Sequence, residues 1–514
     1  MKSRTLVLLP ALCAVLFAAP SVAQETVRTN PPAPVPVTSA DAQVAFQTGI
    51  AAYKAGDLPL AETELAKATA GSDASGDANG WYGFILLKRN KPAAAVPFLE
   101  KAVAQKPEVA DHCTNLGNAL LLKPGRTAAD TTRALEAFRK ATAIAPDSGE
   151  AQFNLGLAYT RLARPKDAAP VYRRATELNP KDDRAFLALG QTYVGLKDFD
   201  SAAKAFRAAA AITPQKADVW TNLGVAEAKR PRPDRGAAIN ALETARKLDG
   251  GTALTLTTLG KLYAETGKPA ESAAAFAAAT AALDGKNTPE AAAILYNQGV
   301  MYTRLGKPDD ALTAYNKALE AKPDYFDAAF NAGTLHYNAA RYADATRLFL
   351  SATKANPLSS VAWMNLGLSL QKQSDETGTV AAWKRAAELQ PSDYAIRDAL
   401  GAVYLRRKAY GDAIAVYRQN TRLRPASGAA WNALGLAQQK SGDYEGAIAS
   451  FTTASKKEPR YAPAYNNLGV VYEKRAQFKL AVAAYKKALQ VDPTFAPALA
   501  NLARYDPKPG TAKL

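Results

Sequence analysis

The sequence contains little of the residues from which most catalytic and metal sites are built. Histidine occurs only at His112 and His336, and cysteine only at Cys13 and Cys113. These residues do not have the spacing of a zinc site, and no Ser–His or Cys–His pair suggests nucleophilic catalysis. A Gly-Lys-Ser/Thr phosphate-binding loop is also absent from the sequence. We therefore expect a protein that is not an enzyme and needs neither a cofactor nor a metal ion, with both histidines in structural roles.

The first residues have the pattern of a secretory signal peptide. Lys2 and Arg4 precede an apolar run from Leu6 to Ala19, and Ser21-Val22-Ala23 supplies small residues where a signal peptidase cleaves. The alternative is an uncleaved anchor, but the run is short for a span of about 20 residues. We expect residues 1–23 to be removed, no membrane span to remain, and the protein to reach the periplasm, the cell envelope or the medium.

The ends of the mature chain are predicted to be irregular. Residues 24–40 include Pro31-Pro32-Ala33-Pro34-Val35-Pro36, which is too rich in proline for a helix and indicates a semi-extended linker. Residues 504–514 are expected to form a short flexible tail, too short for a catalytic domain. Cys113 is the single cysteine after the leader, so stability is expected to come from packing instead of an internal disulfide.

The chain is basic. Lys and Arg number 64 against 47 Asp and Glu, a formal net charge of +17, which loss of Lys2 and Arg4 with the leader would lower by two. Such an excess favours acidic partners or anionic surfaces and carries no information about the fold.

Glycine recurs along the sequence with a fixed period. Nine of the twelve intervals between the repeat glycines are 34 residues, which indicates a helix-turn-helix unit that is copied and stacked because one unit cannot bury its apolar face alone. The repeat glycines are Gly49, Gly83, Gly117, Gly156, Gly190, Gly224, Gly260, Gly299, Gly333, Gly367, Gly401, Gly435 and Gly469.

Other positions keep the same register. A small residue, usually alanine, follows most repeat glycines by twelve residues, and a helix-stopping proline ends most units. Around Gly469 this pattern predicts a first helix over 463–472 and a second over 478–490. Four residues after the small residue stands a large side chain that we expect to fill the space between units: Leu65, Leu99, Phe138, Tyr172, Phe206, Leu242, Phe276, Tyr315, Phe349, Trp383, Tyr417, Phe451 and Tyr485.

This pattern resembles the tetratricopeptide repeat (TPR), with Trp220, Trp363, Trp431 and Tyr465 at the leading aromatic position of that family. The resemblance implies an all-α, right-handed superhelical solenoid of helix-turn-helix repeats over residues 41–503, with thirteen repeats and a C-terminal capping helix. The two longest intervals, of 39 residues each, suggest insertions, one in 123–130 and one in 284–289. The first is expected to be a surface loop. The second is either a hinge between two subarrays or a tolerated loop, and the low cost of lengthening a loop favours the latter.

The resemblance also implies where a ligand would bind. In this family the first helix of each repeat lines a concave groove, and the side chain two residues before the glycine points into it. Some members use asparagines at this position to hold the backbone of an extended peptide, and a carboxamide can both donate and accept. The alternative is that these asparagines only hydrogen-bond between neighbouring repeats. The residues are Asn115, Asn154, Asn222, Asn297, Asn331, Asn365, Asn467 and Asn501.

Apolar residues occupy neighbouring groove positions in the C-terminal half, and exposed apolar strips usually mark contact surfaces. They are Val300, Phe330, Met364, Leu368, Leu436 and Val470. Three residues before the glycine, no repeat has the Lys or Arg that the family's clamp for a C-terminal carboxylate needs. A receptor of that type is therefore not expected.

A basic residue recurs five positions after the glycine. One cation near the end of a helix is favourable by itself, by about 0.3–1 kcal/mol, but a row in register also suits an anionic ligand. The N-terminal members are Lys54, Lys88, Arg161 and Lys229, and the C-terminal members, taken as candidate anion-binding residues, are Arg304, Lys372, Arg406, Lys440 and Lys474.

Two functions follow from these rows. The leading hypothesis is a non-catalytic scaffold of the cell envelope that binds an extended segment of a partner protein, possibly acidic, in its concave groove. The alternative is an envelope adaptor that binds an anionic polymer through the basic row. Nucleic acid is a less suitable partner, because the aromatic residues occupy core positions and do not alternate with the basic ones to form stacking platforms.

Overall fold

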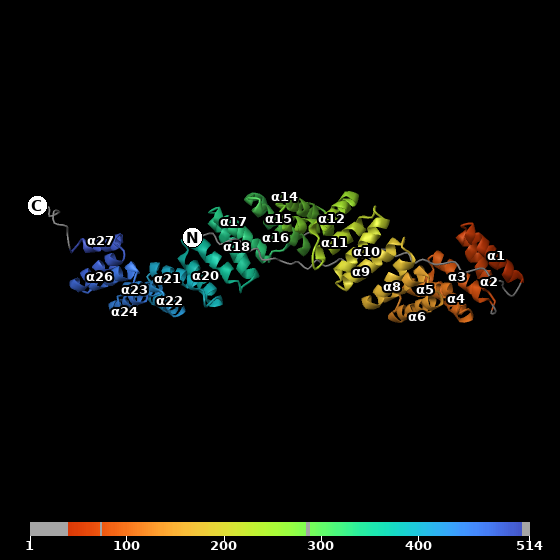
Figure 1. Ribbon diagram of the computed structural model, residues 1–514, viewed down its shortest axis with the longest axis horizontal. Coiled ribbons are helices and arrows are strands. Elements are labelled where there is room, and N and C mark those ends of the chain that lie inside the picture. The colour runs from red at the N-terminus through yellow and green to blue at the C-terminus, as the bar shows by residue number, and fades with distance from the viewer. Residues whose placement is uncertain (1–39, 72–73, 284–287, 506–514) are drawn as a thin grey trace. The chain divides into compact units, whose positions relative to one another are not determined.

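The computed structural model describes residues 40–71, 74–283 and 288–505. The predicted signal peptide, nearly all of the predicted linker, and tail residues 506–514 lie outside these ranges. Within them the regular structure is helical throughout, which confirms the predicted all-α fold (Figure 1). Contacts divide the chain into two compact units between Gly285 and Lys286, inside the predicted insertion at 284–289, of which residues 284–287 also lie outside the described ranges.

The N-terminal unit consists of seven helix pairs within the described residues. Its helices are α1 (Ala40–Lys54), α2 (Leu58–Ala68), α3 (Gly76–Lys88), α4 (Pro92–Gln105), α5 (Ala110–Leu122), α6 (Ala128–Ile144), α7 (Gly149–Arg161), α8 (Pro165–Leu178), α9 (Asp183–Gly195), α10 (Phe199–Ile212), α11 (Ala217–Lys229), α12 (Arg235–Asp249), α13 (Ala253–Glu265) and α14 (Pro269–Ala281).

The C-terminal unit consists of six helix pairs and a final short helix within the described residues. Its helices are α15 (Pro289–Arg304), α16 (Pro308–Ala321), α17 (Phe326–Asn338), α18 (Tyr342–Ala355), α19 (Ser360–Lys372), α20 (Glu376–Leu389), α21 (Tyr394–Arg406), α22 (Tyr410–Leu423), α23 (Gly428–Ser441), α24 (Tyr444–Lys457), α25 (Ala462–Lys474), α26 (Phe478–Val491) and α27 (Ala496–Leu502). The observed α25 and α26 agree with the two helices predicted around Gly469.

The repeat glycines allow the two helices of a repeat to approach closely. A Cβ atom added to Gly469 would lie 2.5 Å from the ring of Tyr485, and one added to Gly299 would lie 2.6 Å from the ring of Tyr315. Both tyrosines are fully buried. The predicted partnership of glycine and large side chain is therefore a direct contact, and any larger residue at these positions would collide with the ring.

Most repeats reverse direction through a residue with a left-handed backbone, although the turn between α11 and α12 has none. In the turn between α23 and α24 this residue is Gly442, with φ of 88°. Lys408 and Ala476 occupy the same place in neighbouring repeats, with φ of 59° and 57°. Because the tight turn sends the second helix back along the first, the first helices of successive repeats follow one another along one side of each unit.

The insertion in the third repeat is organised differently from the predicted loop. Residues 123–127 form the turn, but 128–130 already belong to α6. Thr127 caps this helix, since its hydroxyl accepts the Asp130 N–H while the Asp130 side chain accepts the Thr127 N–H. This reciprocal capping box stabilises an extra helical turn, so the expectation of a loop through residue 130 is wrong.

Candidate interaction surface

The odd-numbered helices α15 to α25 are the first helices of the C-terminal repeats, and their side chains away from the paired second helices form what we call the first-helix face. The sequence places most of the candidate residues on this face. The structure separates them into side chains that hold the repeats together and side chains that remain accessible.

The predicted row of asparagines is heterogeneous. Asn115 and Asn154, in the N-terminal unit, are 0% exposed, so in this structure they present no accessible amide, contrary to the expectation for a groove residue. The remaining six are partly exposed: Asn222, Asn297, Asn331, Asn365, Asn467 and Asn501.

Three asparagines of the row form hydrogen bonds between neighbouring repeats. Nδ2 of Asn467 donates to Oδ1 of Asn432 at 2.9 Å, and Nδ2 of Asn501 donates to Oδ1 of Asn466 at 2.9 Å. Asn331 donates to the hydroxyl of Tyr296, at 3.4 Å, in the same way. For these positions the structural alternative considered from the sequence is the one observed.

The acceptors of these bonds were not singled out from the sequence. Asn432 and Asn466 lie three residues before their glycines, and both are buried. In the sequence, such a hydrogen bond could be recognised from an asparagine three residues before one repeat glycine and another asparagine 35 residues later. Such a ladder satisfies buried polar atoms that would otherwise cost about 1–3 kcal/mol each.

Asn365 differs from these three, because its carboxamide forms no side-chain hydrogen bond among the described residues. It lies on α19 beside Met364 and one turn before Leu368, both partly buried against neighbouring repeats. Val361 is 56% exposed and precedes Met364 by one turn, and Leu358, in the turn before α19, is 74% exposed. This spacing places Val361, Asn365 and Leu368 along one side of α19.

Leu358 and Val361 were missed in the sequence. The preceding and following repeats carry Asp324 and Ser392 at the position of Leu358. An apolar residue where the adjacent repeats are polar could have indicated this exposed leucine.

The other predicted apolar residues lie closer to the core. Val300 is only 5% exposed, so its expected place on an open surface is corrected. Phe330 packs against the rings of Phe326 and Phe349, with centroids 5.8 and 5.7 Å away. Leu436 and Val470 are partly exposed. These side chains are therefore at most partly exposed on the first-helix face, and they do not form the continuous apolar strip that was expected.

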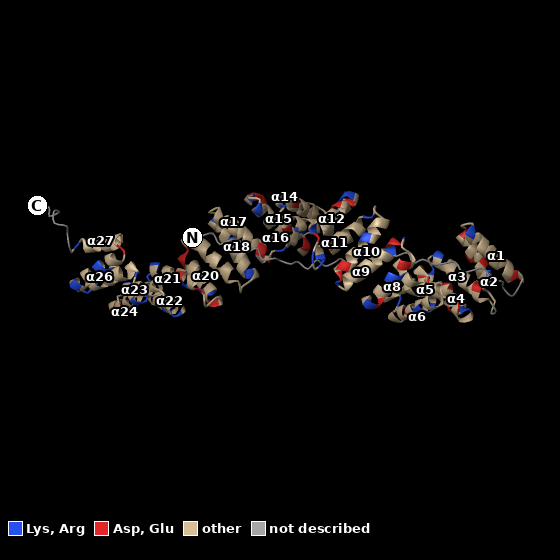
Figure 2. Cartoon of the chain, viewed as in Figure 1, with Lys and Arg blue, Asp and Glu red and all other residues tan. Residues whose placement is uncertain are grey.

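The predicted cations lie in the last turns of their helices. Arg304, Lys372, Lys440 and Lys474 are exposed and have no ion pair within the described part of the chain. Arg406 lies 3.4 Å from a carboxylate oxygen of Glu376. Figure 2 colours Lys and Arg blue and Asp and Glu red along the cartoon of the chain.

Three of their four counterparts in the N-terminal unit contact other residues of the protein, and the fourth, Lys54, is exposed. The guanidinium of Arg161 donates to the Leu121 carbonyl oxygen at 3.2 Å. The ammonium of Lys88 lies 5.4 Å from the ring centroid of Phe84, and that of Lys229 lies 5.9 Å from the ring of Phe199. Burial lowers the pKa of Lys229.

Neither a metal site nor a membrane span is found among the described residues. No group of three or more His, Cys, Asp or Glu side chains there is arranged to hold a metal ion. None of the described helices combines the length and the hydropathy needed to cross a bilayer. His112 is completely buried, and this burial lowers its pKa.

Models of the tetratricopeptide repeat family match more than half of the chain. The matches cover residues 41–122, 126–183 and 257–326, 160–224 and 302–366, 439–475, and 462–495. Together with the paired helices, these matches show that the chain belongs to the tetratricopeptide repeat family. Proteins built from this repeat are scaffolds for interactions with other proteins.

Several solved structures are similar to parts of this chain. MamA from Desulfovibrio magneticus RS-1 is 19% identical, over 33% of this chain and 96% of that one, with a TM-score of 0.30. YrrB, described as a TPR protein with an unusual peptide-binding site, is 21% identical over 41% and 90%, with a TM-score of 0.26. The Cut9–Hcn1 complex of the APC/C is matched at 14% identity over 91% and 96%, with a TM-score of 0.29. No curated protein is significantly similar to the sequence.

Proposed function

We propose that this protein is a non-catalytic scaffold whose C-terminal unit binds an extended segment of a partner protein on the first-helix face. The observation that carries the proposal is the side of α19, where Val361 is 56% exposed and lies in line with the accessible carboxamide of Asn365. An amide with no hydrogen bond to the protein can pair with a peptide backbone, while apolar neighbours exclude water from that bond.

The proposed surface differs from the predicted groove in one respect. Asn331, Asn467 and Asn501 already hold neighbouring repeats together, so recognition of the partner backbone falls to Asn365 and Asn297. The apolar contacts come from Leu358, Val361 and the edges of Met364 and Leu368. Binding is passive, and its affinity is set by the apolar area removed from water and by the amide pairing.

A pair of charged substitutions tests this proposal. Leu358→Asp with Val361→Asp should lower capture of the partner from an envelope fraction at least tenfold, because two carboxylates would be placed on the apolar contact. The matched control is Leu350→Asp with Leu423→Asp, since these leucines are 41% and 40% exposed on second helices. Equal capture by both variants would contradict the proposal.

The predicted leader supports the proposal that this binding takes place in the periplasm or cell envelope. Fractionation of cells that express the full chain tests it: the mature protein should appear in the periplasmic or envelope fraction and lack residues 1–23. Recovery of the uncleaved chain from the cytoplasm would contradict export.

A second candidate is binding of an anionic polymer. It is favoured by the exposed Lys372, Lys440 and Lys474, which have no carboxylate partner among the described residues. Binding to a polymer should weaken steeply between 50 and 300 mM salt, at about one power of salt concentration per neutralised charge. Binding through amides and apolar contacts should change little over the same range.

A further inference from the structure

The positive charge of the C-terminal unit is concentrated in its last repeats. Residues 401–505 contain 16 Lys and Arg against 6 Asp and Glu, whereas residues 288–400 contain 11 against 12. All 16 of these basic residues are exposed. Figure 2 colours the Lys and Arg positions along α21 to α26 blue. The surface of this region is therefore strongly cationic, and the rest of the unit is nearly neutral.

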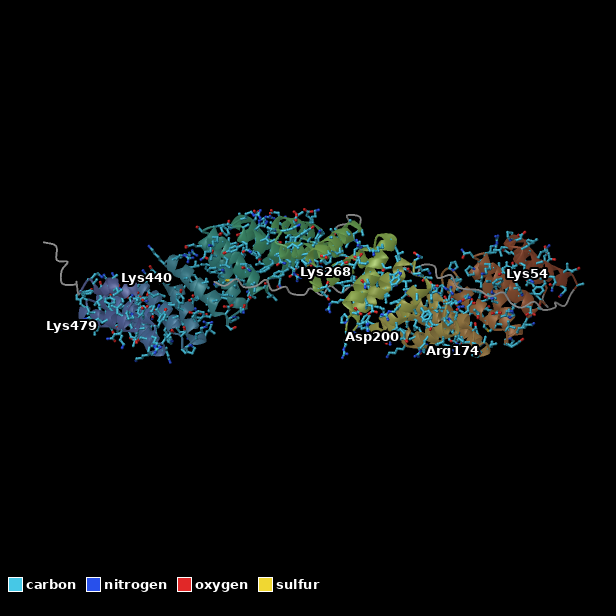
Figure 3. The ribbon with its side chains drawn as sticks, turned by 45° about the horizontal axis from the view of Figure 1, so that its top comes forward. Lys54, Arg174, Asp200, Lys268, Lys440 and Lys479 are labelled. Carbon is cyan, nitrogen blue, oxygen red and sulfur yellow. The ribbon has the colours of Figure 1, made fainter. Side chains whose placement is uncertain are left out.

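One row of these cations follows the ends of the first helices. Arg406, Lys440 and Lys474 occupy the same position in three consecutive repeats, and Arg407 and Arg475 extend the row into the following turns. Arg406 pairs with Glu376 and Arg475 with Glu445. Arg407, Lys440 and Lys474 have no ion pair among the described residues. Figure 3 labels Lys440, and also Lys479 on α26.

A second row lies at the opposite ends of the first helices and was not recognised in the sequence. Before α23 it consists of Arg422 in the last turn of α22 and Arg424 just after that helix. Before α25 it consists of Lys456 and Lys457 in the last turn of α24 and Arg460 in the following turn. None of the five has an ion pair within the described ranges. Cations in the last turn of a helix are favourable by themselves, which accounts for Arg422, Lys456 and Lys457. Arg424 and Arg460 lie beyond the helix ends and need another explanation.

Arg424 is held in place by an aromatic ring. Its guanidinium carbon lies 4.2 Å from the ring centroid of Tyr394 at the start of α21, a cation–π contact. The one carboxylate in these two turns, Glu458, accepts the backbone N–H of Gly428 at 3.1 Å. The second row therefore consists of exposed cations with little local compensation.

The two rows border the face formed by α23 and α25. A helix of 13 residues is about 20 Å long, which sets the distance between the rows. α23 contains no Asp or Glu, and α25 contains only Glu473, whose carboxylate accepts hydrogen bonds from Tyr485 and Arg504. Between the rows lie the partly exposed Leu436 and Val470. The face thus combines apolar contacts in the middle with positive charge at both edges.

We infer that the face of α23 and α25 binds an acidic protein segment that also carries apolar side chains. This inference rests on the proposed function and adds the chemistry of the partner. A segment lying between the rows places its carboxylates near the cations at the edges and its apolar side chains on Leu436 and Val470.

The same observations disfavour a polymer or a nucleic acid on this face. A polyphosphate-like chain has no apolar group to place on Leu436 and Val470. A single-stranded nucleic acid needs exposed aromatic rings for base stacking. Trp431 instead packs in the cluster around Tyr417, and its indole N–H donates to the Pro425 carbonyl at 3.0 Å.

The test uses the full mature chain and a labelled twelve-residue peptide composed of Glu, Leu and Ala. Fluorescence anisotropy measures the affinity of this peptide, of a matched peptide with Gln in place of Glu, and of inorganic polyphosphate. We expect the Glu peptide to bind at least tenfold more tightly than the Gln peptide. Equal affinity for these two peptides, or tighter binding of polyphosphate per charge, would overturn the inference.

Charge reversal identifies the face. The first variant, Lys440→Glu with Lys474→Glu, changes the first row. The second variant, Lys456→Glu with Arg460→Glu, changes the second row and keeps the contact between Arg424 and the Tyr394 ring. Each pair should weaken binding of the Glu peptide at least threefold, and the four together at least tenfold. The control has the same change in net charge in the N-terminal unit, Lys166→Glu, Lys181→Glu, Lys204→Glu and Lys247→Glu, all exposed, and should remain within twofold of wild type. A control that weakens binding as much as the four site changes would overturn the inference.

Two readouts separate this inference from the proposed function. Thermal unfolding monitored by circular dichroism establishes that each variant is folded. If Leu358→Asp with Val361→Asp abolishes partner capture while the four charge reversals leave it unchanged, the acidic-segment inference fails and the proposed function stands. If the charge reversals abolish capture and the α19 variant does not, binding resides on α23 and α25 and the assignment to α19 fails.

Discussion

Most of the basic residues five positions after the repeat glycine behave differently in the two units, with Lys54 and Arg406 as the exceptions. In the N-terminal unit, Arg161 donates to the Leu121 carbonyl, and Lys88 and Lys229 lie over aromatic rings. In the C-terminal unit, Lys440 and Lys474 have no such contact among the described residues. One row in the sequence thus contains side chains that support the repeats and side chains that extend into solvent.

The difference shows that a periodic residue does not have one role throughout a repeat protein. A cation at the end of a first helix contributes about 0.3–1 kcal/mol through the helix dipole, and the N-terminal members add local contacts to that. Among the C-terminal members, Arg406 pairs with Glu376, and the other four have no ion pair among the described residues. A negatively charged partner would explain why these cations are so numerous and why a second basic row lies near them.

Both units depend on the close contact between a repeat glycine and an aromatic ring. Disrupting this contact is expected to have the largest effect on the free energy of unfolding. Gly190 and Gly435 face Phe206 and Phe451, and an added Cβ would lie 2.5 and 2.6 Å from these rings. Gly190→Val and Gly435→Val should each destabilise their unit by about 1–3 kcal/mol, because overpacking forces the ring or the helix to move. Chemical denaturation of the full chain measures both effects.

Gly195 and Gly411 provide the control, since an added Cβ at either position meets no atom within 4 Å. Gly195→Ala and Gly411→Ala should leave both units at least as stable as wild type. A loss as large as that of the valine variants would show that close helix contact is not the reason for the repeat glycines.

A pair of asparagine variants separates support from recognition within the C-terminal unit. Asn467→Ala should cost about 1 kcal/mol, because it leaves the buried Asn432 without its donor. Asn365→Ala should change the unfolding free energy by less than about 0.5 kcal/mol and should weaken partner capture. Thermal unfolding and pulldown measure the two effects, and a large stability loss in Asn365→Ala would place this residue with the structural asparagines.

Replacing the basic residues at the ends of the first helices is expected to have a smaller effect on the free energy of unfolding. Arg161→Gln should lower the unfolding free energy of the N-terminal unit by about 0.5–1.5 kcal/mol through loss of a charged hydrogen bond. Lys440→Gln should cost no more than about 0.5 kcal/mol, as expected for a surface residue without contacts. Equal losses at the two positions would remove the distinction between the units.

The smallest expected effect concerns one acid near the C-terminal cations. Burial raises the pKa of Asp398, although the Tyr394 hydroxyl and Arg424 oppose this shift. A raised pKa in the folded state means stability that is present below the pKa of the unfolded chain and lost as pH rises through the folded value. Asp398→Asn should therefore raise the unfolding temperature slightly at pH 7, and the gain should shrink at pH 4. A lower unfolding temperature at pH 7 would show that the nearby cations compensate this carboxylate.

Much of the fold could be predicted from the sequence because its determinants are local and repeated. The interval from glycine to large side chain fixed contacts such as Gly469–Tyr485, and the prolines marked the helix ends. The capping box of Thr127 and Asp130 was overlooked, since one threonine and one aspartate three residues apart are common in loops as well.

The site could be predicted only in part, because accessibility depends on neighbours in other repeats. Asn154 and Asn365 occupy the same repeat position, yet one is buried and the other partly exposed. The engagement of Asn467 depends on an acceptor 35 residues away in the sequence. The second basic row escaped notice because its residues do not share one repeat position. Arg422 and Lys456 lie 34 residues apart, but the other three have no basic counterpart in the neighbouring repeats.

Site-specific photo-cross-linking in the full chain tests directly whether a partner protein binds on the first-helix face. A photoreactive residue at Val361, on the first-helix face, is compared with one at Leu350, on the second helix α18, under the same exposure to an envelope fraction. We expect a strong cross-linked band at position 361 and little or none at position 350. Cross-linking of the same partner mainly at position 350 would contradict it.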